Sequence, residues 1–233
     1  RYVILSSRKS VGNMAIKIII IVVCIILSYN KTLGNAISNL NTFFHESFHA
    51  LTSLILGNKV KEIEFDTSAE GSCKSISKSK FRTVLCSLSG YIGCALLSLL
   101  FIFCIKEQVT HITFIILTCL SFFILMLYIR KTYALIWTIC FACINLALFL
   151  LPTPILIEKY ILFTYSTIIL IENTKACCSI FYLSIFKAKN SGDCHILAKI
   201  TKIPAFIWST IFNAINCWVL YRFIQLCFLE NYL

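Results

Sequence analysis

Long apolar runs separated by short polar connections make up most of this chain. The runs cover residues 15–29, 36–57, 84–105, 109–129, 133–151, a stretch within 155–186, and 204–228. A helix needs about 20 apolar residues to cross the hydrocarbon core of a bilayer, and most of these runs reach or approach that length. The pattern therefore predicts an all-α integral membrane protein, in which residues 1–233 form a single bundle of about six or seven transmembrane helices.

The composition agrees with this class and excludes others. Hydrophobic residues make up 59% of the 233 positions and charged residues only 13%, whereas a soluble domain contains about twice that charged fraction. The net charge of +11 does not indicate nucleic acid as a partner, because the Lys and Arg residues lie in the connections, where membrane topology places them. Most cysteines lie inside apolar runs as small packing residues, and we expect no disulfide framework.

The charges in the connections predict an orientation. With seven spans, one side of the membrane receives Arg1, Arg8, Lys9, Lys59, Lys61, Lys74, Lys78, Lys80, Arg82, Arg130, Lys131, Lys187, Lys189, Lys199 and Lys202, and the other receives only Lys31, Lys106, Lys159 and Arg222. Positively charged loops stay preferentially in the cytosol, so we expect a cytosolic N-terminus. The rule does not choose an organelle, and an endoplasmic reticulum or Golgi membrane and a bacterial inner membrane are both open.

One connection, residues 58–83, is long enough to contain structure of its own. Within it Ile63 and Phe65 alternate with acidic residues, which is the period-two pattern of a strand. Gly71 follows after a polar, turn-like stretch. The pattern predicts a small β-hairpin at the cytosolic membrane face, and a disordered basic loop is the alternative.

The second apolar run contains His45-Glu46-Ser47-Phe48-His49, an HExxH motif. Residues four apart share a helix face, so both imidazoles can bind one zinc ion with Glu46 beside them. A water bound to zinc has a pKa near 7, and Glu46 could take its proton and pass it to the leaving amine of a peptide. Ionisable residues within a span are expensive and usually functional. The alternative is a buried polar knot that pairs with another helix.

Further polar residues extend the face of the motif helix. Ser38, Asn41 and Thr42 precede His45 at helical spacing. Such a stripe suits either a water-accessible groove or hydrogen bonding between helices, and the sequence leaves both interpretations open.

Small residues early in the third run predict close helix packing. Ser89, Gly90 and Gly93 have the spacing that lets two helices approach, and we expect them to pack against the motif helix. Tyr91, between them, is expected to serve packing rather than catalysis.

An HExxH motif in a transmembrane segment, followed closely by glycine and a strand-like region, resembles the site-2 protease family of intramembrane zinc metallopeptidases. The more similar part of that family is its compact, peptidase-like branch. The resemblance rests, in chain order, on residues 44–51, 57–60, 63–66 with Gly71, 89–93, and 191–198 leading through Thr201 and Pro204 to Trp208.

In that family a carboxylate from a distant helix completes the zinc site, and the resemblance implies that Asp193 is this ligand. Zinc needs three protein ligands and an open position for water, and His45, His49 and Asp193 would provide them. The usual order of aspartate before glycine is reversed here, because Gly192 precedes Asp193.

The predicted topology places Asp193 and His49 at different depths in the membrane. Asp193 falls in an expected cytosolic connection, whereas His49 lies about 12 Å below that membrane face at 1.5 Å per helical residue. Asp193 can therefore reach the zinc only if residues 187–203 fold back into the bundle or if the sixth span ends later in the chain. The alternative for Asp193 is an N-cap of the helix that follows it, and the alternative ligands are Glu172 and His195.

Together, the motif and the resemblance imply an intramembrane zinc endopeptidase, with Zn²⁺ as cofactor and Glu46 as general base. Its expected partners are a transmembrane protein substrate, cut within or beside its span, and the lipid bilayer. An open strand edge of the hairpin could hold an extended substrate segment. The rivals are an inactive homologue that acts as a membrane binding or scaffold protein, and a transporter or metal channel, for which the fourth and fifth runs offer only His111 and Asn145.

Overall fold

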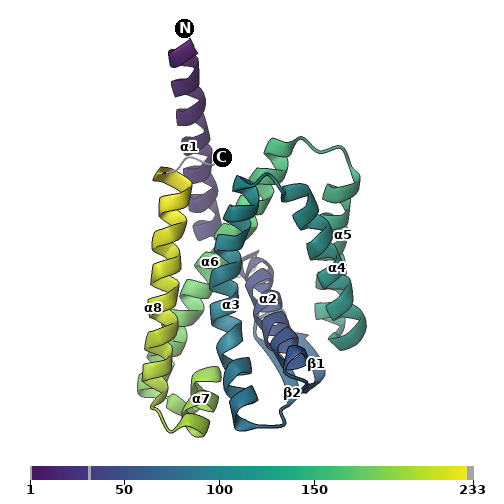
Figure 1. The fold of residues 1–233 in the computed structure, drawn as a ribbon, viewed down its shortest axis with the longest axis vertical. Helices are drawn as coiled ribbons and strands as arrows, with labels where there is room; N and C mark the ends of the chain where they lie inside the picture. Colours follow the sequence, from purple (N-terminus) through teal and green to yellow (C-terminus); the bar gives the residue numbers. More distant parts are fainter. Residues whose placement is uncertain (1, 31–32, 230–233) are drawn as a thin grey trace.

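The protein is described here by a computed structural model that covers residues 2–30 and 33–229, with side chains for residues 13–30 and 33–228. Arg1 and Lys31, which entered the charge comparison, lie outside the described residues. The elements in chain order are α1 (Tyr2–Ser28), α2 (Leu33–Ile55), β1 (Lys59–Phe65), β2 (Gly71–Ile76), α3 (Lys80–Lys106), α4 (Thr110–Tyr128), α5 (Thr132–Leu150), α6 (Ile155–Phe186), the 3₁₀ turn η1 (Ala188–Asn190), α7 (Asp193–Thr201), α8 (Ala205–Ile224) and the π turn η2 (Gln225–Leu229). Figure 1 shows them as a helical bundle with the two strands at one end.

Four helices in the described part of the chain are long and apolar enough to cross a membrane: α3, α4, α5, and α8 extended to Phe228. A fifth span results if Asn13–Ser28 of α1 and the whole of α2 are counted as one broken span. The 32-residue α6 is not among them, because polar residues such as Glu172 and Lys175 make it less apolar. The chain is thus a multi-pass membrane protein, and the predicted count of six or seven spans is not confirmed.

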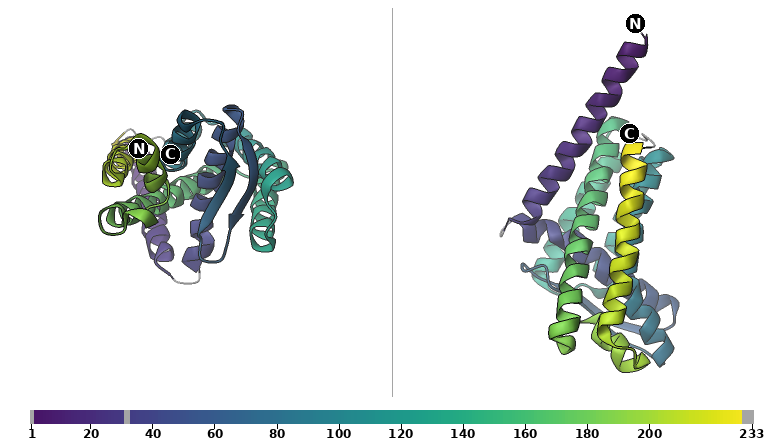
Figure 2. Two further views of the ribbon diagram at one scale, coloured as in Figure 1. Left: turned by 90° about the horizontal axis from the view of Figure 1, so that it is seen from below. Right: turned by 90° about the vertical axis from the view of Figure 1, so that its left-hand side faces the viewer.

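The first two apolar runs do not form two antiparallel crossings. α1 and α2 meet at a bend of 104°, and they follow one another from the end that holds both termini toward the end that holds the hairpin (Figures 1 and 2). Lys175 of α6 holds this bend. Its Nζ donates to the carbonyl oxygen of Ser28 at 2.8 Å and to the buried Glu172 carboxylate at 2.9 Å. The start of α1 therefore lies opposite the hairpin, which differs from the seven-span arrangement.

The predicted β-hairpin is confirmed. β1 and β2 pair antiparallel, with Phe65 opposite Gly71 at the turn end and Ile63 opposite Cys73. Ile63 and Phe65 are almost completely buried in the core, whereas Lys74 pairs with the acidic side chains that alternate with them. The period-two pattern thus places one face of the hairpin against the bundle and leaves the charged face outward.

The two edges of the hairpin differ. On the β1 side, Ile63 forms a parallel bridge with Ile129, just after α4. Beside it, the Nζ atom of Lys131 lies 2.9 Å from Oε2 of Glu64, and this hydrogen bond holds the pKa of the Glu64 carboxyl below its usual range. No comparable backbone pairing of the β2 edge is found among the described residues, so β2 carries the open edge.

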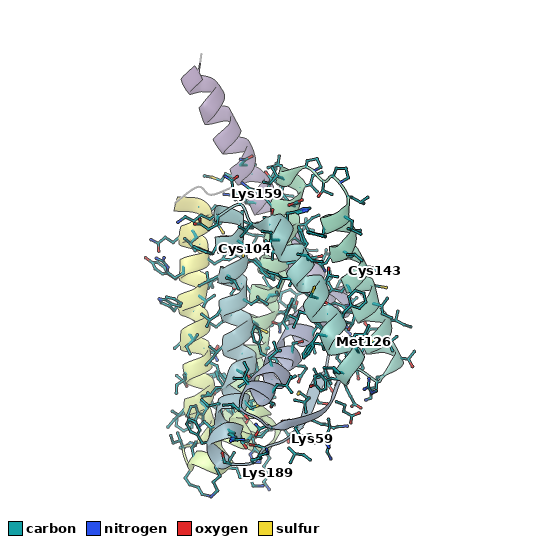
Figure 3. All side chains as sticks on the ribbon, turned by 45° about the vertical axis from the view of Figure 1, so that its right-hand side comes forward. Lys59, Cys104, Met126, Cys143, Lys159 and Lys189 are labelled. Carbon is teal, nitrogen blue, oxygen red and sulfur yellow. The ribbon has the colours of Figure 1, made fainter. Side chains whose placement is uncertain are left out.

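The connection after α6 folds back toward the bundle, which is one of the two arrangements that would let Asp193 reach the histidines. α6 ends at Phe186, η1 then contacts α6 and α7, and α7 packs beneath α3 and α8 at the hairpin end (Figure 1). Leu197 and Cys194 of α7 are buried against Phe212 of α8. Figure 3 labels Lys59 and Lys189 at this end of the bundle and Lys159 at the other.

Candidate metal centre

The HExxH motif lies in the second half of α2, and the two faces of that helix have different neighbours. Phe43 and Phe44 are 0% and 1% exposed and anchor the apolar face in the core. His45 and His49 lie on successive turns of the polar face, with ring centroids 4.6 Å apart. The helical spacing of the motif therefore brings both imidazoles to one side, as the sequence predicts.

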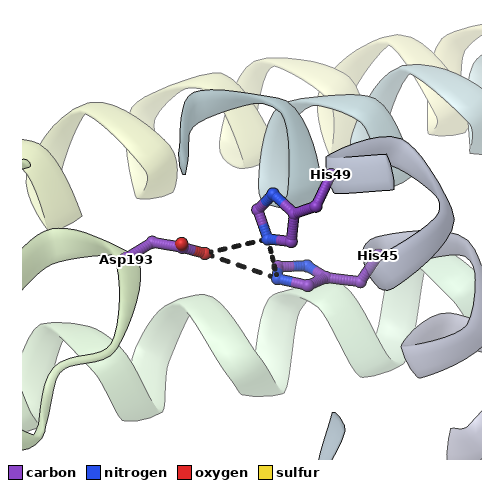
Figure 4. A group of neighbouring side chains, drawn as sticks. All are labelled: His45, His49 and Asp193. Carbon is purple, nitrogen blue, oxygen red and sulfur yellow. Dashed lines mark hydrogen bonds and ion pairs between the residues drawn. The ribbon is translucent and has the colours of Figure 1, made fainter. Parts of the chain in front are cut away.

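Asp193 joins the two histidines in space. Its Oδ2 lies 3.5 Å from Nε2 of His45 and 3.2 Å from Nε2 of His49, and the two Nε2 atoms are 3.0 Å apart (Figure 4). Within the part of the chain that is described, this is the group of side chains with the composition and spacing of a metal site. Ligands held 2.0–2.1 Å from a tetrahedral zinc lie about 3.3 Å from one another, so the three atoms fit zinc with one position left open.

A backbone contact sets the orientation of the second imidazole. Nδ1 of His49 lies 2.7 Å from the carbonyl oxygen of Cys86. A carbonyl can only accept, so Nδ1 carries the proton and Nε2 presents its lone pair toward Asp193 and His45. The hydroxyl of Ser89 donates to the same carbonyl at 2.7 Å, which further fixes this part of α3 against the ligand.

The local backbone explains why the carboxylate of Asp193 points inward. Gly192 adopts φ of +52° immediately before α7, a conformation that favours glycine, and Asp193 begins the helix. Gly192 occupies the N-cap position and makes no side-chain cap, so Asp193 is free of the capping role that was its alternative. Burial would raise the pKa of the Asp193 carboxyl, but the neighbouring His49 and His45 outweigh it and leave that pKa below its usual range.

Two glycines of α3 allow the motif helix to approach, which confirms the packing predicted for them. A Cβ atom added at Gly90 would lie 2.5 Å from Cε1 of His45 and 2.7 Å from Nε2 of His49. One at Gly93 would lie 2.5 Å from the ring of Phe48. Any larger side chain at Gly90 would therefore displace the proposed ligands themselves.

Glu46 lies under the hairpin. Its side chain is buried with the residue 5% exposed, and a Cβ atom added at Gly71, the first residue of β2, would come within 2.8 Å of its Oε1. Glu46, both histidines and Asp193 line a cavity of about 880 Å³ that opens between α2, β2 and the starts of α3 and α7. The cavity has room for an extended peptide segment beside the carboxylate.

The polar stripe on α2 serves both purposes that the sequence left open. Asn41 and Thr42 line the cavity. A further polar residue of α2, Asn39, joins helices and hairpin, because its Nδ2 donates to the hydroxyl of Tyr133 at 2.9 Å and to the carbonyl oxygen of Asp66 at 3.3 Å. Thr42 of the stripe also bonds the hairpin, since its Oγ1 donates to the carbonyl oxygen of Ala69 at 2.9 Å.

The other residues singled out in the sequence lie apart from the three ligand atoms or serve packing. Glu172 is paired with Lys175, and His195 is not part of the cluster. Tyr91 packs its ring between His45, at 4.5 Å, and Phe212, at 5.1 Å. It both packs and lines the cavity, which the sequence could not separate, since an aromatic in a span has the same pattern in either case.

Known proteins and families were compared with this chain. No curated protein and no solved structure matches the chain. The family model described as Peptidase M50B-like matches residues 18–223, a range that contains α2 with its motif, the hairpin and Asp193. That range covers most of the sequence, and the chain therefore belongs to the Peptidase M50B-like family of site-2 protease-type membrane metallopeptidases.

Proposed function

We propose that this protein is an intramembrane zinc endopeptidase that cleaves membrane-anchored proteins within or beside their transmembrane segments. The observation that carries the proposal is the convergence of two imidazoles from one helix with a carboxylate from a segment about 145 residues away, at 3.0–3.5 Å from one another and beside Glu46.

The protein groups have distinct tasks in this proposal. His45, His49 and Asp193 hold the metal, and the Cys86 carbonyl keeps the imidazole of His49 in the tautomer that can bind it. A bound zinc would supply an acidified water and polarise the peptide carbonyl. Glu46, on the same face and in the same cavity, accepts the proton of the attacking water and delivers it to the amine that leaves.

The open strand edge supports a substrate that is extended when it is cut. All six residues of β2 line the cavity, whereas the far edge of β1 is engaged by Ile129. A helical substrate must unwind before its peptide bond can be attacked, and pairing with β2 would supply the lost backbone hydrogen bonds.

The connection charges still favour a cytosolic hairpin when α1 begins at the opposite end of the bundle. Twelve of the fifteen basic residues lie in the hairpin region, the α4–α5 turn and the segment that contains α7. The side with more Lys and Arg in short connections stays in the cytosol. We therefore place the catalytic cavity toward the cytosolic leaflet and both ends of the described chain on the other side.

The test uses the full-length protein, purified in detergent or nanodiscs, with a panel of single-span membrane proteins as substrates. Wild type should contain about one zinc per chain and cleave at least one substrate. Glu46→Gln should retain the zinc and lose cleavage, and the matched variant Glu70→Gln, in the exposed turn of the hairpin, should retain both. Wild type that binds zinc but cuts nothing would favour an inactive scaffold, and wild type without zinc would overturn the proposal.

A further inference from the structure

Asn41 stands out among the polar groups of the cavity. It lies on α2 one turn before His45, on the same face, and it lines the cavity. The residue is only 7% exposed, and its Oδ1 is buried with no hydrogen-bond partner among the described residues. Leaving an amide unpaired in a buried place is unfavourable, so this position calls for an explanation.

The other buried asparagines show that Asn41 differs from a structural amide. Asn39, Asn145 and Asn173 also have an unpaired Oδ1, but in each of them Nδ2 donates to a backbone or side-chain oxygen nearby. No hydrogen bond of either amide atom is found for Asn41 within the described chain. Of these four, Asn41 is also the one that lines the cavity.

The position of Asn41 on α2 indicates which residue of a bound substrate it could contact. Four helical residues separate it from His45, a rise of about 6 Å. An extended chain advances about 3.3 Å per residue, so Asn41 lies level with a group about two residues from the peptide bond at the metal. α2 begins at its bend with α1, inside the bundle, and ends at the hairpin (Figure 1). With the hairpin end toward the cytosol, as proposed above, the contact is on the side that lies deeper in the membrane.

We propose that Asn41 is a substrate-positioning residue that hydrogen-bonds the main chain of the substrate about two residues from the scissile bond, on its membrane-interior side. This inference rests on the proposed proteolytic function. An unwound segment at that depth exposes N–H and C=O groups that lipid cannot satisfy. The unpaired Oδ1 of Asn41 is an acceptor, so Asn41 can accept a hydrogen bond from a peptide N–H of the substrate. It would lower the cost of unwinding at one position.

The experiment compares full-length wild type with Asn41→Leu and with the matched variant Asn145→Leu, which removes another buried amide from α5, outside the cavity. The substrate is a synthetic transmembrane peptide in nanodiscs, made with all amides or with a single ester bond two residues from the cut on the membrane-interior side. Zinc content, thermal unfolding, the cleavage site and kcat/KM are measured for each pair. The ester removes one N–H, and so it reports on a hydrogen bond at that position.

Asn41→Leu should keep its zinc and its unfolding temperature and lose about 10-fold to 100-fold in kcat/KM, while Asn145→Leu keeps wild-type kcat/KM. The ester should slow wild type and leave Asn41→Leu unaffected, because the variant has already lost the contact. Equal cleavage by wild type and Asn41→Leu, or equal sensitivity of both to the ester, would overturn this inference alone. Wild type that cuts no transmembrane peptide would overturn the proposed function and this inference together.

Discussion

Replacing Gly90 by alanine places a methyl group where the proposed ligands lie. The added Cβ would be 2.5 Å from Cε1 and 2.6 Å from Nε2 of His45, and 2.7 Å from Nε2 of His49, whereas ordinary van der Waals contact begins at about 3.4 Å. Either the two imidazoles or α3 must therefore retreat by about 0.7–0.9 Å. The hydrogen bond from His49 to the carbonyl of Cys86 on α3 opposes a separation of the helix from the ring.

The size of this displacement determines how much zinc affinity the Gly90→Ala variant should lose. Zinc–ligand distances tolerate changes of about 0.2 Å, so a retreat several times larger removes effective coordination by two of the three ligands. Changes that only disturb the support of a ligand typically cost about 10-fold to 100-fold in metal affinity, and Gly90→Ala acts on the ligands directly. We expect zinc affinity to fall by about 100-fold or more, and cleavage to fall at least as much. Overpacking should cost a further 1–3 kcal/mol, roughly, in stability.

Zinc affinity, measured by competition with a fluorescent chelator, separates displacement of the ligands from the general loss of stability by overpacking. Gly93→Ala is the matched control, since its Cβ meets the ring of Phe48 at the same 2.5 Å but touches no proposed ligand. Both variants should unfold at a lower temperature, and only Gly90→Ala should lose zinc. Full zinc affinity in Gly90→Ala would refute the close contact between α3 and the ligands. Equal zinc loss in both variants would show that the loss is not specific to the contact between Gly90 and the proposed ligands.

Three further predictions concern other groups. Asp193→Ala should reduce zinc affinity by more than about 100-fold, measured by the same competition, and unchanged zinc content would exclude it as a ligand. Lys175→Met leaves the buried Glu172 carboxylate without its cation, at a cost of about 3–5 kcal/mol, so its unfolding temperature should drop while Lys175→Arg recovers most of the loss. The lowered pKa of Glu64 means that its pairing with Lys131 stabilises the folded hairpin above pH 4.5 and that this stabilisation is lost as pH falls below that value. Hydrogen exchange of the hairpin amides should therefore rise on acidification in wild type and change much less in Glu64→Gln.

The sequence predicts what depends on local pattern. The membrane class follows from the apolar runs, the hairpin from the alternation around Ile63 and Phe65, and the shared face of the two histidines from their spacing. Each of these depends on residues that are neighbours in the chain or one helical turn apart. The close approach at Gly90 was also predictable, because small residues have few other reasons to cluster in a span.

The parts that the sequence does not determine depend on contacts between distant segments. The bend between α1 and α2 is held by Lys175, about 145 residues further along, and no local signal distinguishes it from a turn between two spans. The position of Asp193 beside the two histidines depends on α7 packing beneath α3. Loop charges predict an N-terminus on the same side as the hairpin only on the assumption that each apolar run crosses the membrane once.

The closure of one hairpin edge has a consequence for self-association in a crowded membrane. A two-stranded sheet with both edges open can link molecules into chains, because each added strand presents a new edge. Here Ile129 terminates the sheet on the β1 side of every molecule. Two copies that joined through β2 would bury both of their open edges in one another, and growth would stop at a pair. The same pairing would cover both cavities, because all six residues of β2 line the cavity of their own molecule.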